Sequence, residues 1–262
     1  MAYKIGITGC TGRVGHLLTK ELLSGNWPDF KLAGGTTRQG KLDGVEFFVT
    51  NNAQELFERS DFIIDFTLPE ATRKHIALAK ETNTPILIAT TGLNAEDEAA
   101  ITELSKSVPV IYAANTSVAV TALAALVEKA AKALPDYDIE IVEAHHKHKV
   151  DAPSGTAIML GKVAAAARNV DFDKVCVLSR EGHTGERIDG QIGFSTIRGG
   201  DAVGEHTIYF LGDGERIEIK QQASDRALYA RGALKAAQWA LGLNGNDAPS
   251  SGLFSMRDVL GL

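Results

Sequence analysis

Residues 3–15 read Tyr-Lys-Ile-Gly-Ile-Thr-Gly-Cys-Thr-Gly-Arg-Val-Gly, and this stretch decides the fold of the first half of the chain. Residues 3–8 are typical of a buried strand. The apolar residues that follow recur at helical spacing: Val14, Leu17, Leu18, Leu22 and Leu23. A strand, a glycine-rich turn and a helix in this order predict the opening of a dinucleotide-binding βαβ unit.

The turn carries glycines with the spacing G-x-x-G-x-x-G, from Gly9 to Gly15, a variant of the commoner G-x-G-x-x-G. Glycine permits a tight turn and a close approach to a pyrophosphate, to which the helix N-terminus offers N–H groups. A structural turn without a ligand is the alternative, and the flanking strand and helix favour the cofactor site. The predicted cofactor-binding residues of this loop are Gly9, Cys10, Thr11, Gly12, Arg13 and Val14.

The second predicted strand, residues 31–36, leads to the position that meets the adenosine ribose of a bound dinucleotide. Folds that prefer NAD place Asp or Glu there, whereas this chain has Thr37 and Arg38. No carboxylate repels a 2′-phosphate, and Arg38 can hold one through charge-assisted hydrogen bonds. We therefore expect NADPH to be preferred and NADH to bind more weakly. The alternative is that Arg38 is a solvated loop charge.

Strands and helices then alternate along the chain. Strands are predicted at residues 62–65, 85–89 and 108–113, with helices at 70–82 and 95–105 between them. This alternation predicts an α/β fold with a parallel, doubly wound Rossmann-like sheet whose ligands lie at the carboxyl ends of the strands. Small and hydroxyl side chains at these ends would let a flat nicotinamide ring approach: Ala89, Thr90, Thr91, Ala113, Ala114, Asn115 and Thr116.

The pattern changes after a predicted helix at residues 118–134. The strands predicted next are residues 138–144, 174–178, 191–197, 205–211 and 215–223. One helix, residues 156–168, interrupts them, and Gly212 to Gly214 is typical of a hairpin turn. We therefore expect a second, α+β domain with a mixed, largely antiparallel open sheet. The last predicted segments are a helix at 226–241, a polar connection at 242–252 and an apolar pattern at 253–260.

The composition is ordinary for a globular protein of 262 residues, with 44% hydrophobic and 23% charged residues. The formal net charge of -6 argues against general binding to nucleic acid or an anionic membrane. We expect no signal peptide and no membrane span, because the first residues contain no long apolar segment. Only Cys10 and Cys176 are present, which excludes a disulfide framework and makes the cytoplasm the expected compartment.

The most unusual stretch is residues 143–156, Glu-Ala-His-His-Lys-His-Lys-Val-Asp-Ala-Pro-Ser-Gly-Thr, which carries three of the seven histidines of the chain. Imidazole and ammonium groups this close repel one another when charged, and His and Lys can supply a proton near neutral pH. The stretch runs into a helix start, where Ser154, Gly155 and Thr156 offer backbone N–H groups and hydroxyls to a carboxylate. We interpret it as a site that binds an anion and gives it a proton.

Two other interpretations compete with this one. The simplest is a strand end with solvated polar residues. A zinc site is the other, with the histidines as ligands and Glu143 or Asp151 beside them. The neighbouring Lys147 and Lys149 disfavour a dication, and no cysteine completes the ligand set. No bound metal is therefore expected.

Residues 143–156 closely resemble the signature of the 4-hydroxy-tetrahydrodipicolinate reductase (dihydrodipicolinate reductase) family, and the resemblance covers essentially the whole chain. The other segments that carry it are residues 9–15, 65–67, 69–70, 90–92, 113–115, 179–187 and 256–258. The resemblance implies reduction of a cyclic, imine-containing dicarboxylate to tetrahydrodipicolinate by NAD(P)H, in the diaminopimelate route to lysine.

The same resemblance implies roles for single residues. His145 matches the proton donor/acceptor of the family, and Lys149 matches its proton-donating lysine; which of the two delivers the proton is left open. The positions that match its carboxylate-holding residues are His146, Gly155 and Thr156. Many members carry an acid before the arginine that Arg38 matches, and Thr37 stands there in this chain. This difference strengthens the expectation of NADPH.

The family fold implies a Rossmann-like domain of residues 1–115 and 226–262, and a domain of residues 116–225 that binds substrate and builds a homotetramer. Both boundaries are expected to act as hinges. Two other functions remain as alternatives. One is another NADP-dependent dehydrogenase of an amino-acid-like substrate, such as an aspartate-type dehydrogenase; the other is a non-catalytic NADP-sensing protein.

Overall fold

The computed structural model describes residues 2–243 and 245–262. Met1, in the predicted first domain, and Asn244, in the predicted polar connection, lie outside the described residues. The chain forms two compact units, Met1–Val118 with Arg226–Leu262, and Ala119–Asp225. Across the ranges that the structure describes, every helix is too short or too polar to cross a membrane.

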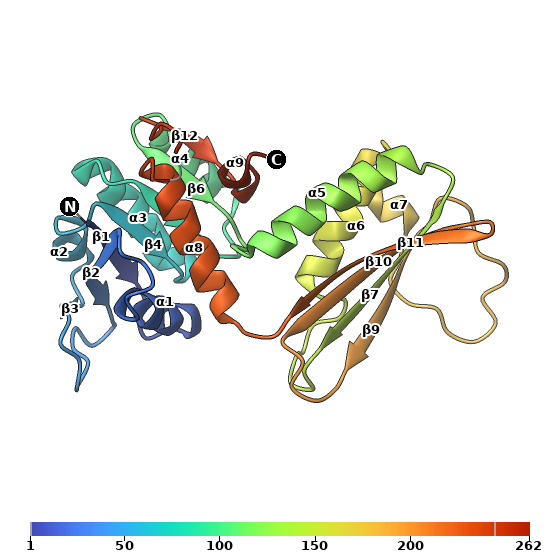
Figure 1. The fold of residues 1–262 in the computed structure, drawn as a ribbon, viewed down its shortest axis with the longest axis horizontal. Coiled ribbons are helices and arrows are strands. Elements are labelled where there is room, and N and C mark those ends of the chain that lie inside the picture. The colour runs from blue at the N-terminus through green and yellow to red at the C-terminus, as the bar shows by residue number, and fades with distance from the viewer. Residues whose placement is uncertain (1, 244) are drawn as a thin grey trace. The chain divides into compact units, whose positions relative to one another are not determined.

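The first unit is built on a seven-stranded sheet in the order β12-β6-β5-β4-β1-β2-β3, in which every pairing is parallel (Figure 1). Its strands are β1 (Tyr3–Thr8), β2 (Phe30–Thr36), β3 (Val49–Thr50), β4 (Phe62–Asp65), β5 (Ile86–Ile88), β6 (Pro109–Tyr112) and β12 (Gly252–Phe254). Its helices are α1 (Arg13–Leu23), α2 (Ala53–Phe57), α3 (Pro69–Thr82), α4 (Ala95–Leu104), α8 (Ala227–Ala240) and α9 (Met256–Leu260). The predicted Rossmann-like sheet is confirmed.

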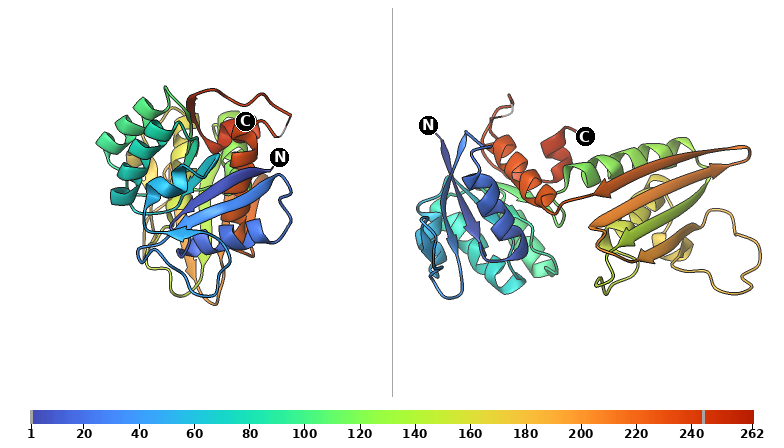
Figure 2. Two further views of the ribbon diagram at one scale, coloured as in Figure 1. Left: turned by 90° about the vertical axis from the view of Figure 1, so that its left-hand side faces the viewer. Right: turned by 60° about the horizontal axis from the view of Figure 1, so that its bottom comes forward.

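Helices cover both faces of this sheet (Figure 2), and each face has its own core. Leu18 of α1 and Ala233 of α8 belong to one core, and Ile76 of α3 and Ile101 of α4 belong to the other. Every residue of β4 and β5 is buried. Burial on both faces explains why these strands are continuous apolar runs in the sequence. Because these strands pair in parallel, their carboxyl ends lie at one edge of the sheet.

The second unit has a mixed five-stranded sheet in the order β11-β10-β7-β9-β8. Its strands are β7 (Asp138–His145), β8 (Cys176–Val177), β9 (Ile192–Arg198), β10 (Gly204–Gly212) and β11 (Glu215–Ala223). Its helices are α5 (Val118–Ala133), α6 (Gly155–Ala167) and α7 (Phe172–Val175). β10 is antiparallel to β7 and β11, whereas β9 is parallel to β7 and β8. The predicted fold class is confirmed.

The structure differs from the sequence prediction in its shortest elements. The sequence predicts a strand at 174–178, where the chain forms α7 and then β8, because Asp171 caps a helical turn by accepting from the N–H of Asp173. Neither β3 nor α2 is predicted. β12 joins the end of the predicted polar connection to the start of the predicted apolar pattern, and it pairs with β6 at the sheet edge. Elements of two to five residues carry too little periodicity to be predicted.

β7 alternates between a buried and an open face, as expected for a strand with helices on one side only. Ile139, Ile141 and Glu143 are buried, and Ile139 and Ile141 pack into a core shared with α5 and α6. The residues between them are partly exposed. A glutamate thus occupies a position of the core face.

Candidate active site

The loop between β1 and α1 folds as a tight turn that requires its glycines. Gly9 has φ +74°, and a Cβ there would lie 2.9 Å from Cγ2 of Thr67. At Gly15 a Cβ would lie 2.2 Å from the carbonyl oxygen of Gly9. The N–H of Gly9 donates to Oγ1 of Thr36 at 3.0 Å and ties the loop to the end of β2. Gly12 precedes α1 without a side-chain cap, so the helix start can receive an anion.

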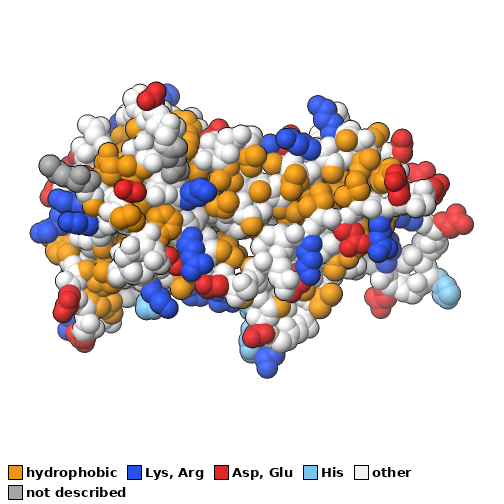
Figure 3. Space-filling model, in the orientation of Figure 1, with side chains coloured by type: hydrophobic (Ala, Val, Ile, Leu, Met, Phe, Trp, Pro, Cys, Tyr) orange, Lys and Arg blue, Asp and Glu red, His pale blue; other side chains and the backbone are white. Residues whose placement is uncertain are grey.

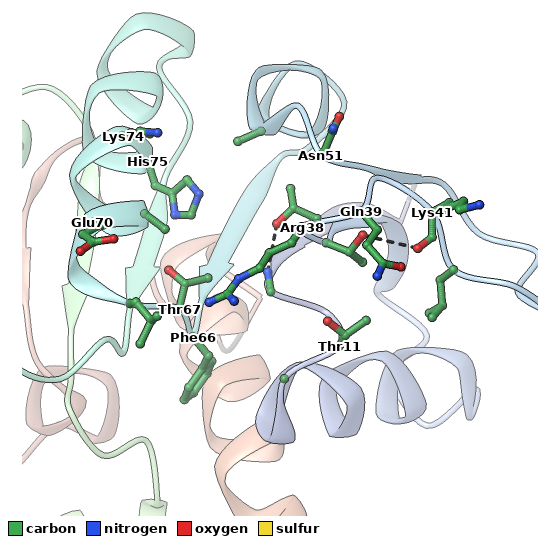
Figure 4. A pocket seen from close by; sticks show the side chains of 18 residues that line it. Thr11, Arg38, Gln39, Lys41, Asn51, Phe66, Thr67, Glu70, Lys74 and His75 are labelled. Atoms are coloured by element: carbon green, nitrogen blue, oxygen red, sulfur yellow. Dashed lines mark hydrogen bonds between the residues drawn. The ribbon is translucent and has the colours of Figure 1, made fainter.

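This loop forms part of the wall of a pocket of about 890 Å³ (Figure 4). The predicted cofactor residues that line it are Gly9, Thr11, Gly12, Thr37 and Arg38. Lys74 and His75 of α3 and Lys41 line it as well. Arg38 is exposed, points into the pocket and forms no ion pair with any residue in the described ranges. Glu70 is the one acidic residue of the lining, so the pocket favours an anionic ligand.

Asp65, at the end of β4, is hydrogen-bonded to α3, the helix that forms one wall of the pocket. Its buried carboxylate accepts from the hydroxyls of Thr8, Thr67 and Thr72 at 2.9, 2.6 and 2.9 Å. Nδ1 of His75 lies 2.9 Å from it. Burial would raise the pKa of Asp65, but the bond to His75 and those from the threonines hold it below its ordinary value. No role for Asp65 was predicted from the sequence, although a charged residue at the end of an apolar strand is a signal of one.

Ten predicted cofactor residues are not among the lining of this pocket: Cys10, Arg13, Val14, Ala89, Thr90, Thr91, Ala113, Ala114, Asn115 and Thr116. Those from Ala89 onward follow β5 and β6 at their carboxyl ends. Oγ1 of Thr90 lies 2.7 Å from Oγ1 of Thr72, and Oγ1 of Thr116 donates to the carbonyl of Tyr229 at 2.8 Å. These two hydroxyls therefore serve the fold of the unit, and contact with a cofactor stays a prediction.

In the second unit, β7 ends at His145, and the chain then turns to begin α6. Nδ1 of His145 lies 2.6 Å from Oε2 of Glu143. Burial would raise the pKa of Glu143, but bonds from Arg198, His145 and the N–H of Ser154 lower it to about 2. An ionised carboxylate can only accept, so Nδ1 carries a proton and Nε2 is the nitrogen left for a substrate.

Glu143 is fully buried and bonded through both oxygens. Nη1 and Nη2 of Arg198 donate to Oε2 and Oε1 at 2.8 and 2.7 Å. The N–H of Ser154 donates to Oε1 at 3.0 Å, and Oγ1 of Thr196 does so at 3.3 Å. The sequence analysis treated Glu143 only as a possible metal ligand and did not single out Arg198. The spacing of two that puts Glu143 and His145 on one face of a strand was an available signal.

Ser154 joins this network to β10. Its Oγ accepts from the N–H of Ala157 at 3.2 Å, as the cap of α6, and lies 3.1 Å from Nε2 of His206. The ring of His206 lies edge-on to that of His145, with centroids 5.3 Å apart. Burial and the charge of His145 lower the pKa of His206 to about 4. His206, which the sequence analysis also missed, is therefore a neutral neighbour of His145 at pH 7.

The other residues predicted for this site lie around the turn and the helix start. Nζ of Lys149 lies 2.8 Å from Oδ1 of Asp151. Nδ1 of His146 accepts a backbone N–H at 3.2 Å. Gly155 is exposed, and nothing lies within 4 Å of the place of a Cβ, so the start of α6 is open to a ligand. Thr156 follows it, partly buried. Within the described part of the chain, no group of three His, Cys, Asp or Glu is arranged to hold a metal ion.

The chain combines a Rossmann-like unit, whose glycine-rich loop is typical of dinucleotide-binding proteins, with a mixed-sheet unit that carries a histidine–glutamate pair. Residues 3–116 match the family described as dihydrodipicolinate reductase, N-terminus, and residues 119–260 match dihydrodipicolinate reductase, C-terminus. The chain belongs to the dihydrodipicolinate reductase family.

Two relatives and one solved structure extend this match. The 4-hydroxy-tetrahydrodipicolinate reductase of Polynucleobacter necessarius subsp. necessarius is 45% identical over 273 residues, which covers 99% of each chain. The reductase of the same name from Acinetobacter baumannii is 42% identical, covering 100% of this chain and 97% of the other. The dipicolinate-bound dihydrodipicolinate reductase from Paenisporosarcina sp. TG-14 has a TM-score of 0.77 and 21% identity, covering 97% of this chain and 98% of that chain. This last likeness shows the fold alone.

Proposed function

We propose that this protein catalyses the NADPH-dependent reduction of 4-hydroxy-tetrahydrodipicolinate (dihydrodipicolinate) to tetrahydrodipicolinate, in the diaminopimelate route to lysine. The observation that carries the proposal is the His145–Glu143 pair beside the open start of α6, in a chain 45% identical to a reductase of that name. The reduction adds one hydride and one proton to the substrate, so the protein must hold a dicarboxylate and move a proton.

In this proposal the first unit binds the cofactor. Gly9 and Gly15 have no room for a Cβ, so the loop keeps the tight turn that is typical of a pyrophosphate-binding loop. Bound NADPH supplies the hydride. Arg38 binds the 2′-phosphate, which favours NADPH over NADH, and Lys41 and Lys74 add positive charge to the same pocket.

The second unit moves the proton. His145 exchanges a proton with the substrate through Nε2, because Glu143 occupies Nδ1. Lys149 is the second proton carrier, and it exchanges its bond to Asp151 for one to the substrate. An ammonium group and an imidazole in one site can divide the tasks of giving a proton and neutralising the negative charge that develops.

The start of α6 holds the carboxylates of the substrate. Gly155 and Thr156 offer N–H groups at a helix N-terminus, where the partial positive charge of the helix favours an anion. His146 lies at the other side of the turn and provides a further donor. Ser154 fixes this helix start, because its own N–H and hydroxyl are bonded to Glu143 and to the next turn of α6.

The assignment is tested by following NADPH absorbance when the substrate is generated in place by the preceding synthase. We expect rapid loss of absorbance, with tetrahydrodipicolinate as product, and a slower reaction with NADH. Absence of turnover with either nicotinamide would contradict the assignment. Binding of NADPH without turnover would favour a sensing protein, and turnover of aspartate-like substrates alone would favour an aspartate-type dehydrogenase.

We also propose that the open face of the second sheet assembles the protein into a homotetramer. Val142 and Tyr209 lie on this face and are partly exposed, and Ile197 is 54% exposed. Figure 3 shows hydrophobic and charged side chains mixed over the visible surface of this unit. Light scattering after gel filtration should give four times the chain mass of 27.9 kDa, and Tyr209→Glu should reduce it.

A further inference from the structure

We propose that Glu143 is a positioning residue for the reaction: its carboxylate fixes the tautomer and orientation of His145, and Arg198 balances its charge. This inference rests on the proposed function, since it gives Glu143 a part in the proton transfer by His145.

The position of Glu143 on β7 is that of a core residue. The residues that precede it on the same face, Ile139 and Ile141, are fully buried in the apolar core of the unit. Transfer of a carboxylate into such surroundings costs free energy unless partners replace its hydration. Replacing a buried ion pair by apolar residues is often neutral or stabilising. A buried charge here therefore indicates a task beyond stability.

The bond to Nδ1 decides which nitrogen of His145 can react. A neutral imidazole has one N–H and one acceptor nitrogen, and the partner of one nitrogen selects the state of the other. Glu143 holds the proton on Nδ1 at 2.6 Å, so exchange with a substrate takes place at Nε2 alone. The ring of His206, edge-on at 5.3 Å, packs against the same imidazole. Glu143 thus acts on the proton transfer through His145.

Arg198 keeps Glu143 ionised and ties the network to the turn. An unpaired buried carboxylate would become protonated, and as a neutral carboxyl it would be a weaker acceptor for the N–H of Nδ1 and could donate to that nitrogen instead. The guanidinium bonds to both oxygens of Glu143, and its Nη2 also donates to the carbonyl of Asp151 at 2.7 Å. One side chain therefore links the strand that carries His145 with the turn that carries Lys149. We assign Arg198 as the second positioning residue.

A purely structural role for Glu143 and the positioning role differ in one measurable respect. If Glu143 acts through His145, its removal has no further effect on the rate once His145 is gone, because residues that act as a unit are not additive. If Glu143 only holds Ser154 and β9 in place, its removal lowers the residual rate of a His145 variant by the same factor as in the wild type.

The experiment is a cycle of the wild type, Glu143→Gln, His145→Gln and the double variant. We expect Glu143→Gln to lower kcat on the order of 100-fold, with KM for NADPH nearly unchanged. The double variant should be no slower than His145→Gln alone, and the solvent deuterium isotope effect on kcat should rise in Glu143→Gln. If Glu143→Gln lowers kcat by the same factor in the wild type and in His145→Gln, the inference is overturned. Wild-type turnover in Glu143→Gln would overturn it as well.

Two further variants keep the test informative if Glu143→Gln does not fold. Glu143→Asp keeps the charge for Arg198 but is one methylene shorter, and it should lose turnover in the same way. The control is Glu103→Gln, because Glu103 is exposed on α4 of the first unit and its carboxylate accepts from Nζ of Lys106 at 2.5 Å. It should keep kcat within about twofold.

A readout without turnover separates this inference from the proposed function. In the apo-protein labelled with ¹⁵N-histidine, the Nδ1–H proton of His145 should be protected from exchange in the wild type and not in Glu143→Gln. An equally protected proton in both proteins would overturn the positioning role. A wild type with the protected proton but no turnover would contradict the proposed function and leave the positioning geometry in place.

Discussion

A Cβ placed on Gly204 would lie 3.0 Å from Nε2 of His145. Gly204 begins β10 and is buried, and its missing side chain leaves space beside the nitrogen that we assign to proton exchange. The geometry therefore relates a glycine on β10 to the reactivity of a histidine on β7.

Gly204→Ala should lower kcat roughly tenfold, because a methyl group would displace the imidazole by a few tenths of an ångström or narrow the approach to Nε2. Binding of NADPH, measured by fluorescence titration, should not change. Gly199→Ala is the control, since a Cβ at Gly199 meets nothing within 4 Å. Wild-type kcat in Gly204→Ala would show that the substrate does not use this side of His145.

Arg38→Ala should weaken the binding of NADPH about tenfold to 100-fold, because a charge-assisted hydrogen bond to a phosphate contributes about 1.5–3 kcal/mol. Binding of NADH should change far less. The measurement is the dissociation constant of NADPH and of NADH for the wild type and for Arg38→Ala. Arg59→Ala is a suitable control, because Arg59 stacks on Phe48 at 4.2 Å and does not line the pocket. Equal weakening of NADPH and NADH would refute the phosphate role.

The central strands and the glycine-rich loop of the first unit could be predicted from the sequence. The apolar runs of β4 and β5 and the glycines from Gly9 to Gly15 each have one simple structural cause, burial on both faces or a tight turn. Arg38 was expected to meet a cofactor from its place after β2; it lines the pocket of the first unit, and its contact with a cofactor stays a prediction. The local residue pattern and the alternation of strands with helices are enough to predict such features.

The network around His145 shows where sequence reasoning ends. Glu143 is two residues away and could have been inferred from strand periodicity. Arg198 meets Glu143 only because β9 pairs in parallel with β7, which places His145 opposite Arg198. His206 lies on β10, which pairs with the opposite edge of β7 and places His206 beside Glu143. Strand order and register depend on the packing of the whole unit, and no short motif encodes them.

Stability should fall with acid in two pH windows. The pKa of His206 is about 4 in the folded protein against an ordinary 6.5, so the unfolded chain takes up this proton first and stability is lost from pH 6.5 to 4. The pKa of Glu143 is about 2 against 4.5, so its contribution is lost from pH 4.5 to 2. Each window corresponds to about 3 kcal/mol.

His206→Gln tests the upper window. Between pH 7 and 5 the wild type should lose about 2 kcal/mol more of its unfolding free energy than this variant. Urea unfolding of both proteins at the two pH values provides the comparison. If the two proteins lose the same amount, the low pKa of His206 is wrong.

Asp65→Asn should lower the unfolding free energy by about 3 kcal/mol, because the amide cannot replace a charged acceptor that serves His75 and three threonine hydroxyls. Asp61→Asn is the control: Asp61 is exposed and accepts from the N–H of Lys4 at 2.7 Å. A change below about 1 kcal/mol in Asp65→Asn would show that the network contributes little.

The central claim is that His145 moves the proton of an NADPH-dependent reduction of 4-hydroxy-tetrahydrodipicolinate. Its most direct test is the rate of NADPH oxidation with this substrate, measured for the wild type and for His145→Gln, together with the NADPH dissociation constant of each. We predict turnover by the wild type, a loss on the order of 100-fold or more in His145→Gln, and unchanged NADPH binding. Equal rates in the two proteins, or no turnover by the wild type, would contradict the claim.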